Sequence, residues 1–174
     1  MSSNSTTLTK PSATSDQSFE PEETVKDRYL CFSLGTQGFG VPISQVKEIV
    51  EMQEITPVPH MPSYIQGVIN LRGQIIPLLD LRTRMGMEYR AYDRRTCVVI
   101  VQHRDRQVGL AVDRMEEVLQ FRPEVREPAP DYRSVGELHR FIDSLGRHQQ
   151  RVLMLLDPQV ILSQSAIPEG PNGN

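Results

Sequence analysis

Apolar and polar residues alternate with a period of two in several short stretches, the pattern of a strand with one buried face. In 29–34 the alternation places Leu30, Phe32 and Leu34 on one face, and the glycine-containing turn 35–38 follows. Six further stretches fall into three pairs, each pair flanking a short polar or glycine-containing turn: 68–71 with 74–79, 96–102 with 107–112, and 141–145 with 151–156. The pattern therefore predicts a chain built mostly from β-hairpins.

Helical spacing is confined to two short segments. In 44–51 a serine stands at the N-cap position, and Val46, Ile49 and Val50 follow at the spacing of one helix face. The segment 158–163 is interpreted as another short helix. We expect one short helix in each.

An internal repeat divides the chain. Residues 40–50 and 109–119 share one pattern: glycine, apolar, small, apolar, N-cap residue, any, apolar, any, glutamate and two apolar residues. The strand before each block also matches, and downstream 75–80 parallels 152–157. Three matched blocks in one order predict two tandem β-modules of ~50–60 residues, joined near 85–95, and modules of that size commonly close as barrels.

The two ends of the chain differ from its centre. Residues 1–24 include eleven serines or threonines and few apolar residues, so we expect a disordered tail there. The segment 165–174 is interpreted in the same way. The globular part is expected to span 25–164, with a first module over about 28–84 and a second over about 95–162.

Composition narrows the function classes. The chain has 174 residues, 38% of them apolar, and no apolar run of the ~18–20 residues that a membrane span requires. Its first ten residues do not resemble a secretory signal, so we expect a cytoplasmic protein with no membrane insertion. The net charge is −3, and the globular part is close to neutral, which argues against a nucleic-acid partner. Sixteen residues are arginines, five of them between Arg82 and Arg95, and either a solvated loop or a carboxylate-binding segment fits that cluster.

Residues typical of catalysis or of metal binding occur without the required spacing. The four histidines form no ligand motif, and two cysteines are too few for a four-thiolate zinc site. Asp80, Asp113 and Asp157 each end an apolar strand, where capping the following turn is the expected role. Cys31 and Cys97 occupy equivalent first strands and are interpreted as small buried apolar residues. We therefore predict no catalytic residue, no cofactor and no metal.

A surface for another protein is the remaining hypothesis. The segment 61–82 is strongly apolar although it contains several prolines and glycines. Two small barrels side by side leave a groove, and apolar groups lining such a groove beside one cation are typical of a site for a partner helix.

The same residues resemble a known family. The chain is similar to the CheW family of bacterial chemotaxis coupling proteins from about residue 26 to 162, and the Asn-Leu-Arg-Gly sequence within 67–73 is specific. The matching blocks are 29–35, 39–43, 46–49, 67–73, 76–82, 109–113 and 151–157.

The resemblance implies an all-β fold with a few short helices, in which two tandem SH3-like five-stranded barrels form one CheW-like domain. It also implies a non-enzymatic adaptor that joins the cytoplasmic tip of methyl-accepting chemoreceptors to the histidine kinase CheA, through a kinase regulatory domain of the same fold. Receptor contacts in the family fall on positions that match Val46, Gly67 and Arg72, with Glu48 close by, so these four are the candidate receptor-binding residues. Core packing for Val46 and a turn for Gly67 remain alternatives, whereas Arg72 is the strongest candidate because arginine at a hairpin turn is seldom buried.

Two other functions stay open from the sequence. One is a CheW-like adaptor of another chemosensory pathway, such as a pathway that controls twitching pili. The other is a free-standing pair of small barrels that binds a peptide or a small ligand, or an enzyme whose site the sequence does not reveal.

Overall fold

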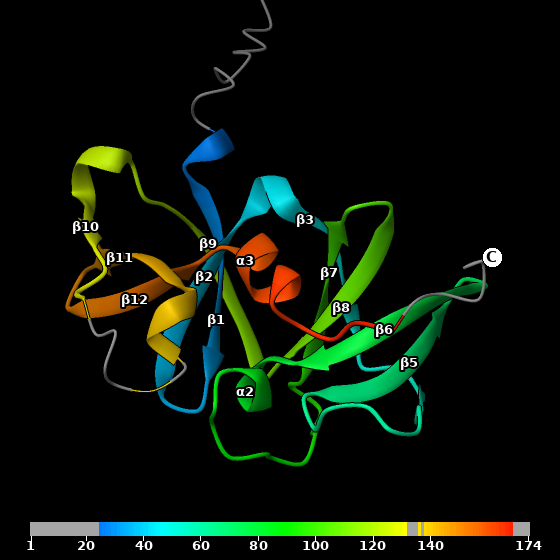
Figure 1. The fold of residues 1–174 in the computed structure, drawn as a ribbon. Coiled ribbons are helices and arrows are strands. Elements are labelled where there is room, and N and C mark those ends of the chain that lie inside the picture. The colour runs from blue at the N-terminus through cyan, green and yellow to red at the C-terminus, as the bar shows by residue number, and fades with distance from the viewer. Residues whose placement is uncertain (1–24, 132–135, 137, 169–174) are drawn as a thin grey trace, which may run out of the picture.

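Two β-sheets lie side by side in the computed structural model, which describes residues 25–131, 136 and 138–168 (Figure 1). The first sheet has the strand order β10 (Arg126–Pro128), β11 (Ile142–His148), β12 (Arg151–Leu156), β2 (Gln37–Pro42), β1 (Arg28–Leu34) and β9 (Arg114–Gln120). The second has the order β3 (Val46–Glu51), β7 (Cys97–His103), β8 (Arg106–Val112), β6 (Gln74–Asp80), β5 (Ile65–Leu71) and β4 (Ile55–Thr56).

The helical segments of the described residues are short, and all of them except the last, which follows the final strand, connect two strands. They are α2 (Leu81–Arg84), α3 (Pro158–Ser163) and three 3-10 turns, η1 (Ile43–Gln45), η2 (Pro123–Val125) and η3 (Leu138–Phe141). In Figure 1, α3 lies between the two sheets. The all-β prediction with a few short helices is confirmed, as is the helix over 158–163.

The repeat accounts for the order of the strands. Listed from its opposite edge, the second sheet has the strand order β4-β5-β6-β8-β7-β3. The first sheet has the order β10-β11-β12-β2-β1-β9, and the two strands at each place in these orders are equivalent in the repeat. Each sheet takes two strands from one repeat and four from the other. Strands of different repeats pair in parallel at β2 with β12 and at β6 with β8, and antiparallel at β1 with β9 and at β3 with β7. The predicted modules 28–84 and 95–162 are therefore not two separate sheets. A sequence repeat identifies the two copies, but it does not determine which copy a strand pairs with.

The helix predicted over 44–51 is wrong. Only the single turn η1 forms there, and β3 follows at once and pairs with β7. Burial in β3 alternates strictly, with Val46 and Val50 half-buried and Ile49 exposed. Three β-branched residues among six satisfy a helical spacing by coincidence but favour a strand, because their side chains pack well on a pleated surface.

The largest group of buried side chains joins the two sheets. It includes Phe32 and Phe39 of the first sheet, stacked with ring centroids 6.0 Å apart, and Val99 and Leu110 of the second. Each sheet also holds a smaller apolar cluster of its own. The sheets therefore share one core and support each other.

Arg84 adds a polar link to this core. Its guanidinium lies 4.8 Å from the ring centroid of Tyr64 and 4.5 Å from that of Phe141, and the residue is only 4% exposed. Its Nε also donates to Ser165 Oγ at 2.7 Å.

Within the described residues, no helix is long and apolar enough to cross a bilayer.

Candidate functional site

The hairpin between β5 and β6 carries the strongest candidate from the sequence. Arg72 and Gly73 form its two-residue turn with φ of 49° and 85°, the left-handed values that a tight hairpin requires. Asn70 stabilises the turn, because its Oδ1 accepts a hydrogen bond from the Gly73 backbone N–H at 2.9 Å. The Arg72 side chain is 68% exposed, so the predicted hairpin turn presents it to solvent.

An ion pair brings together two of the four predicted residues. Arg72 donates from its guanidinium to Glu48 Oε1 on β3. β3 is one edge of the second sheet and β5 lies next to the other edge, so a side-chain contact between them requires the sheet to curl. The curled sheet thus places a cation and an anion side by side on its surface.

Val46 and Gly67 have structural roles in the chain itself. Val46 is partly buried and packs against the core that joins the two sheets. Gly67 is buried in β5 and not in a turn, at a bulge opposite β6 with φ of 140°. A Cβ at Gly67 would lie 2.2 Å from the Thr56 carbonyl oxygen of β4, so the close backbone approach expected at this glycine is made by the chain's own neighbouring strand.

A hollow of about 570 Å³ lies next to the Arg72–Glu48 pair. Lys47 and Gly73, the chain neighbours of Glu48 and Arg72, both line it. The remaining lining residues come from the start of β6 and from the β7–β8 hairpin: Gln74, Ile75, Ile76, Pro77, Gln102, Asp105, Arg106 and Gln107. Sequence reasoning missed the contribution of the β7–β8 hairpin, which it treated only as a polar turn.

Four exposed apolar side chains occur at equivalent positions of the two sheets. Ile49 of β3 and Ile75 of β6 are 44% and 48% exposed. Their repeat equivalents, Val118 of β9 and Val152 of β12, are 46% and 51% exposed. The repeat was visible in the sequence, but which of its apolar positions face solvent depends on the pairing of the strands.

Two of the three aspartates that were predicted to cap a turn do so in the structure. Asp80 Oδ1 accepts from Thr83 N–H at 2.8 Å and Asp157 Oδ1 from Gln159 N–H at 2.9 Å, so both cap the helix that follows, as predicted. Asp113 instead precedes strand β9, so it caps no helix there, and its carboxylate accepts from the Gly35 backbone N–H and from Arg82.

Cys31 is fully buried, and this burial raises the pKa of its thiol to about 12, which keeps it protonated and unreactive. The apolar role predicted for Cys31 is confirmed, whereas Cys97 is only half-buried.

The family model of the CheW-like domain matches residues 28–166, most of the chain. The chain belongs to the CheW-like family. It is 36% identical over 141 residues to a chemotaxis protein CheW of Klebsiella aerogenes, a match that covers 81% of this chain and 84% of the relative. The fold matches a crystal structure of the scaffolding protein TtCheW from Thermoanaerobacter tengcongensis with a TM-score of 0.73 and 26% identity, covering 82% of this chain and 99% of that one.

The chain is also similar to Protein PilI of Pseudomonas aeruginosa, but over a shorter stretch. The two are 32% identical over 82 residues, which is 47% of this chain and 46% of the relative. The CheW relatives cover the domain more fully, so the comparison favours a chemotaxis adaptor.

Proposed function

We propose that this protein is the adaptor that couples methyl-accepting chemoreceptors to a CheA-type histidine kinase in chemotaxis. The observation that carries the proposal is the Arg72–Glu48 pair on the surface of a CheW-like domain. The resemblance to the family implies a receptor contact at Arg72, with Glu48 close by. The protein would work on the cytoplasmic face of the membrane, held there by its partners.

The receptor contact is argued from the geometry of Arg72. A guanidinium has five N–H donors, and the pair with Glu48 occupies only part of them. Glu48 fixes the direction of the arginine, and the remaining donors are free to take a carboxylate of a receptor helix. The neighbouring hollow, with Ile75 and Pro77 in its wall, offers apolar surface for the same helix.

The kinase contact is argued from the repeat. Two exposed apolar residues, Ile49 and Ile75, lie on the second sheet, and their repeat equivalents, Val118 and Val152, lie on the first. A partner with the same fold can dock on either sheet through the same type of contact. Because the two pairs lie on different sheets, one adaptor can hold two such partners, which supports an alternating arrangement of adaptor and kinase.

The receptor contact is tested with Arg72→Ala in a pull-down or titration with receptor cytoplasmic fragments. Loss of a charge-assisted pair is expected to weaken binding by roughly 5- to 150-fold. The matched control is Arg147→Ala, which removes an arginine of similar exposure (66%) that is paired with Glu127 on the other sheet. Equal receptor affinity for wild type and both variants would remove Arg72 from the contact.

The coupling itself is tested by a phosphorylation assay with receptor-bearing membranes, a CheA-type kinase and ATP. Receptor control of the kinase is expected only when the protein is present, because a scaffold acts by holding both partners at once. Identical kinase output with and without the protein would contradict the proposal. Using receptors of a pilus-controlling pathway in a second arm separates chemotaxis from the alternative pathway.

A further inference from the structure

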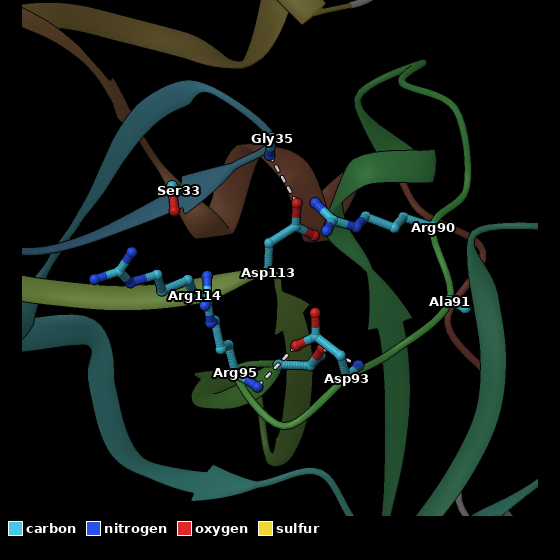
Figure 2. Close-up of a pocket in the computed structure, with 9 residues that line it drawn as sticks. Ser33, Gly35, Arg90, Ala91, Asp93, Arg95, Asp113 and Arg114 are labelled. Carbon is cyan, nitrogen blue, oxygen red and sulfur yellow. Dashed lines mark hydrogen bonds between the residues drawn. The ribbon is translucent and has the colours of Figure 1, made fainter.

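A second hollow has a lining that includes neither Arg72 nor Glu48. It has a volume of about 120 Å³ and is bordered by the β1–β2 turn, the segment between α2 and β7, and the start of β9 (Figure 2). Three arginines line it, Arg90, Arg95 and Arg114, each from a different point on the rim. None of the residues described above for receptor or kinase contact takes part in it.

The three arginines are not neutralised within the described part of the chain. Arg90, Arg95 and Arg114 are exposed, and their guanidinium groups form no ion pair with any described residue. The whole chain carries a net charge of −3, so three unpaired cations around one small hollow are a local excess of opposite sign. Such an excess attracts an anion.

Two carboxylates also line the hollow, and the structure accounts for both. Asp113 accepts from the Gly35 backbone N–H at 2.7 Å and from Arg82 at 2.5 Å, so its charge is already paired. Asp93 accepts from the Arg95 backbone N–H at 2.8 Å, and its carboxylate forms no ion pair with any cation of the described residues. With Arg82 counted, four arginines face two carboxylates, and the surplus is positive.

The segment that carries Arg90 and Arg95 is held in place. Arg82 Nε donates to the Glu88 carbonyl at 3.0 Å, and Tyr92 OH donates to Asp80 Oδ2 at 2.7 Å. At the end of the segment, Asp93 N–H donates to Thr96 Oγ1 at 2.9 Å, and Thr96 is 6% exposed. The arginines therefore extend from an ordered backbone, which lowers the entropic cost of gathering them around a ligand.

We propose that this hollow is a binding site for a doubly charged oxyanion, inorganic phosphate or a phosphate monoester. The planar fork of arginine matches the oxygens of a phosphoryl group, and several arginines around one group are the usual arrangement for it. The hollow has room for one such group and not for a helix. The site goes beyond receptor and kinase coupling, since it gives the adaptor a ligand of its own.

The proposal is tested by NMR or calorimetric titration of the full chain with inorganic phosphate at constant ionic strength. Saturable binding is expected, and Arg95→Gln and Arg114→Gln should each weaken it by about 3- to 10-fold. The matched control is Arg94→Gln, which removes the same charge from an exposed residue of the same segment that does not line the hollow. Absence of saturable binding, or equal weakening by Arg94→Gln, would overturn the proposal.

Asp93→Asn gives a test of opposite sign. The asparagine Oδ1 can still accept from the Arg95 N–H, but the negative charge in the lining is gone. Phosphate should then bind more tightly, by about 2- to 5-fold. Weaker binding in this variant would contradict an oxyanion in the hollow.

The source of the phosphoryl group is separated by a second ligand. A short phosphoserine peptide is titrated beside its unphosphorylated form and inorganic phosphate. Tighter binding of the phosphopeptide than of phosphate assigns the site to a phosphorylated protein segment, and equal binding assigns it to a free small ligand. Equal binding of both peptide forms, together with no saturable binding of inorganic phosphate, would overturn the proposal. Because only this chain and the ligand are present, failure here leaves the coupling function untouched.

Discussion

The two sheets are built on one plan and differ at the places where one of them is specialised. Both have the same strand order, and both contain a bulge at the equivalent point, opposite Leu78 in β5 and opposite Leu155 in β11. The residue that resumes the pairing after the bulge is Gly67 in the second sheet and Ser144 in the first. The turn that ends the same strand is Arg72-Gly73 in the second sheet, between β5 and β6, and Gln149-Gln150 in the first, between β11 and β12. Shared features thus maintain the fold, and the departure at the hairpin turn gives the second sheet the exposed arginine that pairs with Glu48.

The bulge provides the largest predicted effect on stability. Gly67→Ala places a Cβ 2.2 Å from the Thr56 carbonyl oxygen at a φ of 140°, so β4 must move and the backbone is strained. We expect a loss of about 3 kcal/mol or more, or a Tm lower by about 6–12 °C. Ser144→Ala at the equivalent bulge should cost no more than about 1 kcal/mol.

Thermal or denaturant unfolding of both variants measures this difference. If Gly67→Ala were as stable as wild type, the close approach of β4 would not be required. Reduced receptor binding by a destabilised Gly67 variant would therefore report on folding, and it would not place this glycine in the receptor contact.

The two aspartates that cap α2 and α3 give the next effect. Asp80 is 1% exposed, and it accepts from Thr83 and from the hydroxyl of Tyr92, whereas Asp157 is half-buried. Burial, and then the hydrogen bond to Asp80, raise the pKa of Tyr92, so its hydroxyl remains a donor at neutral pH. Asp80→Ala leaves these donors without a partner and should cost about 2–3 kcal/mol, against about 1 kcal/mol for Asp157→Ala.

A double-mutant cycle with Tyr92→Phe checks the cause. If the Asp80–Tyr92 bond accounts for the difference between the two caps, Tyr92→Phe should cost much less in the Asp80→Ala background than in wild type. Additive losses would show that the two equivalent caps differ for another reason.

Local patterns predicted the strands, the short helix over 158–163 and the cap at Asp80 because each depends on neighbouring residues. The strand over 46–51 was predicted as a helix because its pairing partner, β7, lies some fifty residues further along the chain. The contact between Glu48 and Arg72 was likewise invisible, since it requires the sheet to curl and bring its edges together. The arginine-lined hollow combines three distant segments, and the sequence showed only that arginines are concentrated between 82 and 95.

The hairpin turns give the smallest effect on stability and the sharpest test of the comparison between sheets. Arg72→Gln places in the second sheet the residue that the first sheet has at the equivalent position, and it removes an ion pair at the surface. The cost to folding should be below about 0.5–1 kcal/mol, because exposed ion pairs contribute little. Receptor affinity should nevertheless fall, since the donors for a receptor carboxylate are lost with the charge.

The reciprocal variant, Gln149→Arg, restores the net charge on the other sheet, where Glu117 is the repeat equivalent of Glu48. If charge alone attracted the receptor, the double variant would bind like wild type. If position matters, as the location of Arg72 beside Glu48 and the larger hollow requires, the double variant should bind as weakly as Arg72→Gln alone. If Gln149→Arg restored receptor affinity to the Arg72→Gln variant, the two sheets would be interchangeable in this contact. The hypothesis that the second sheet is specialised for the receptor would then be wrong.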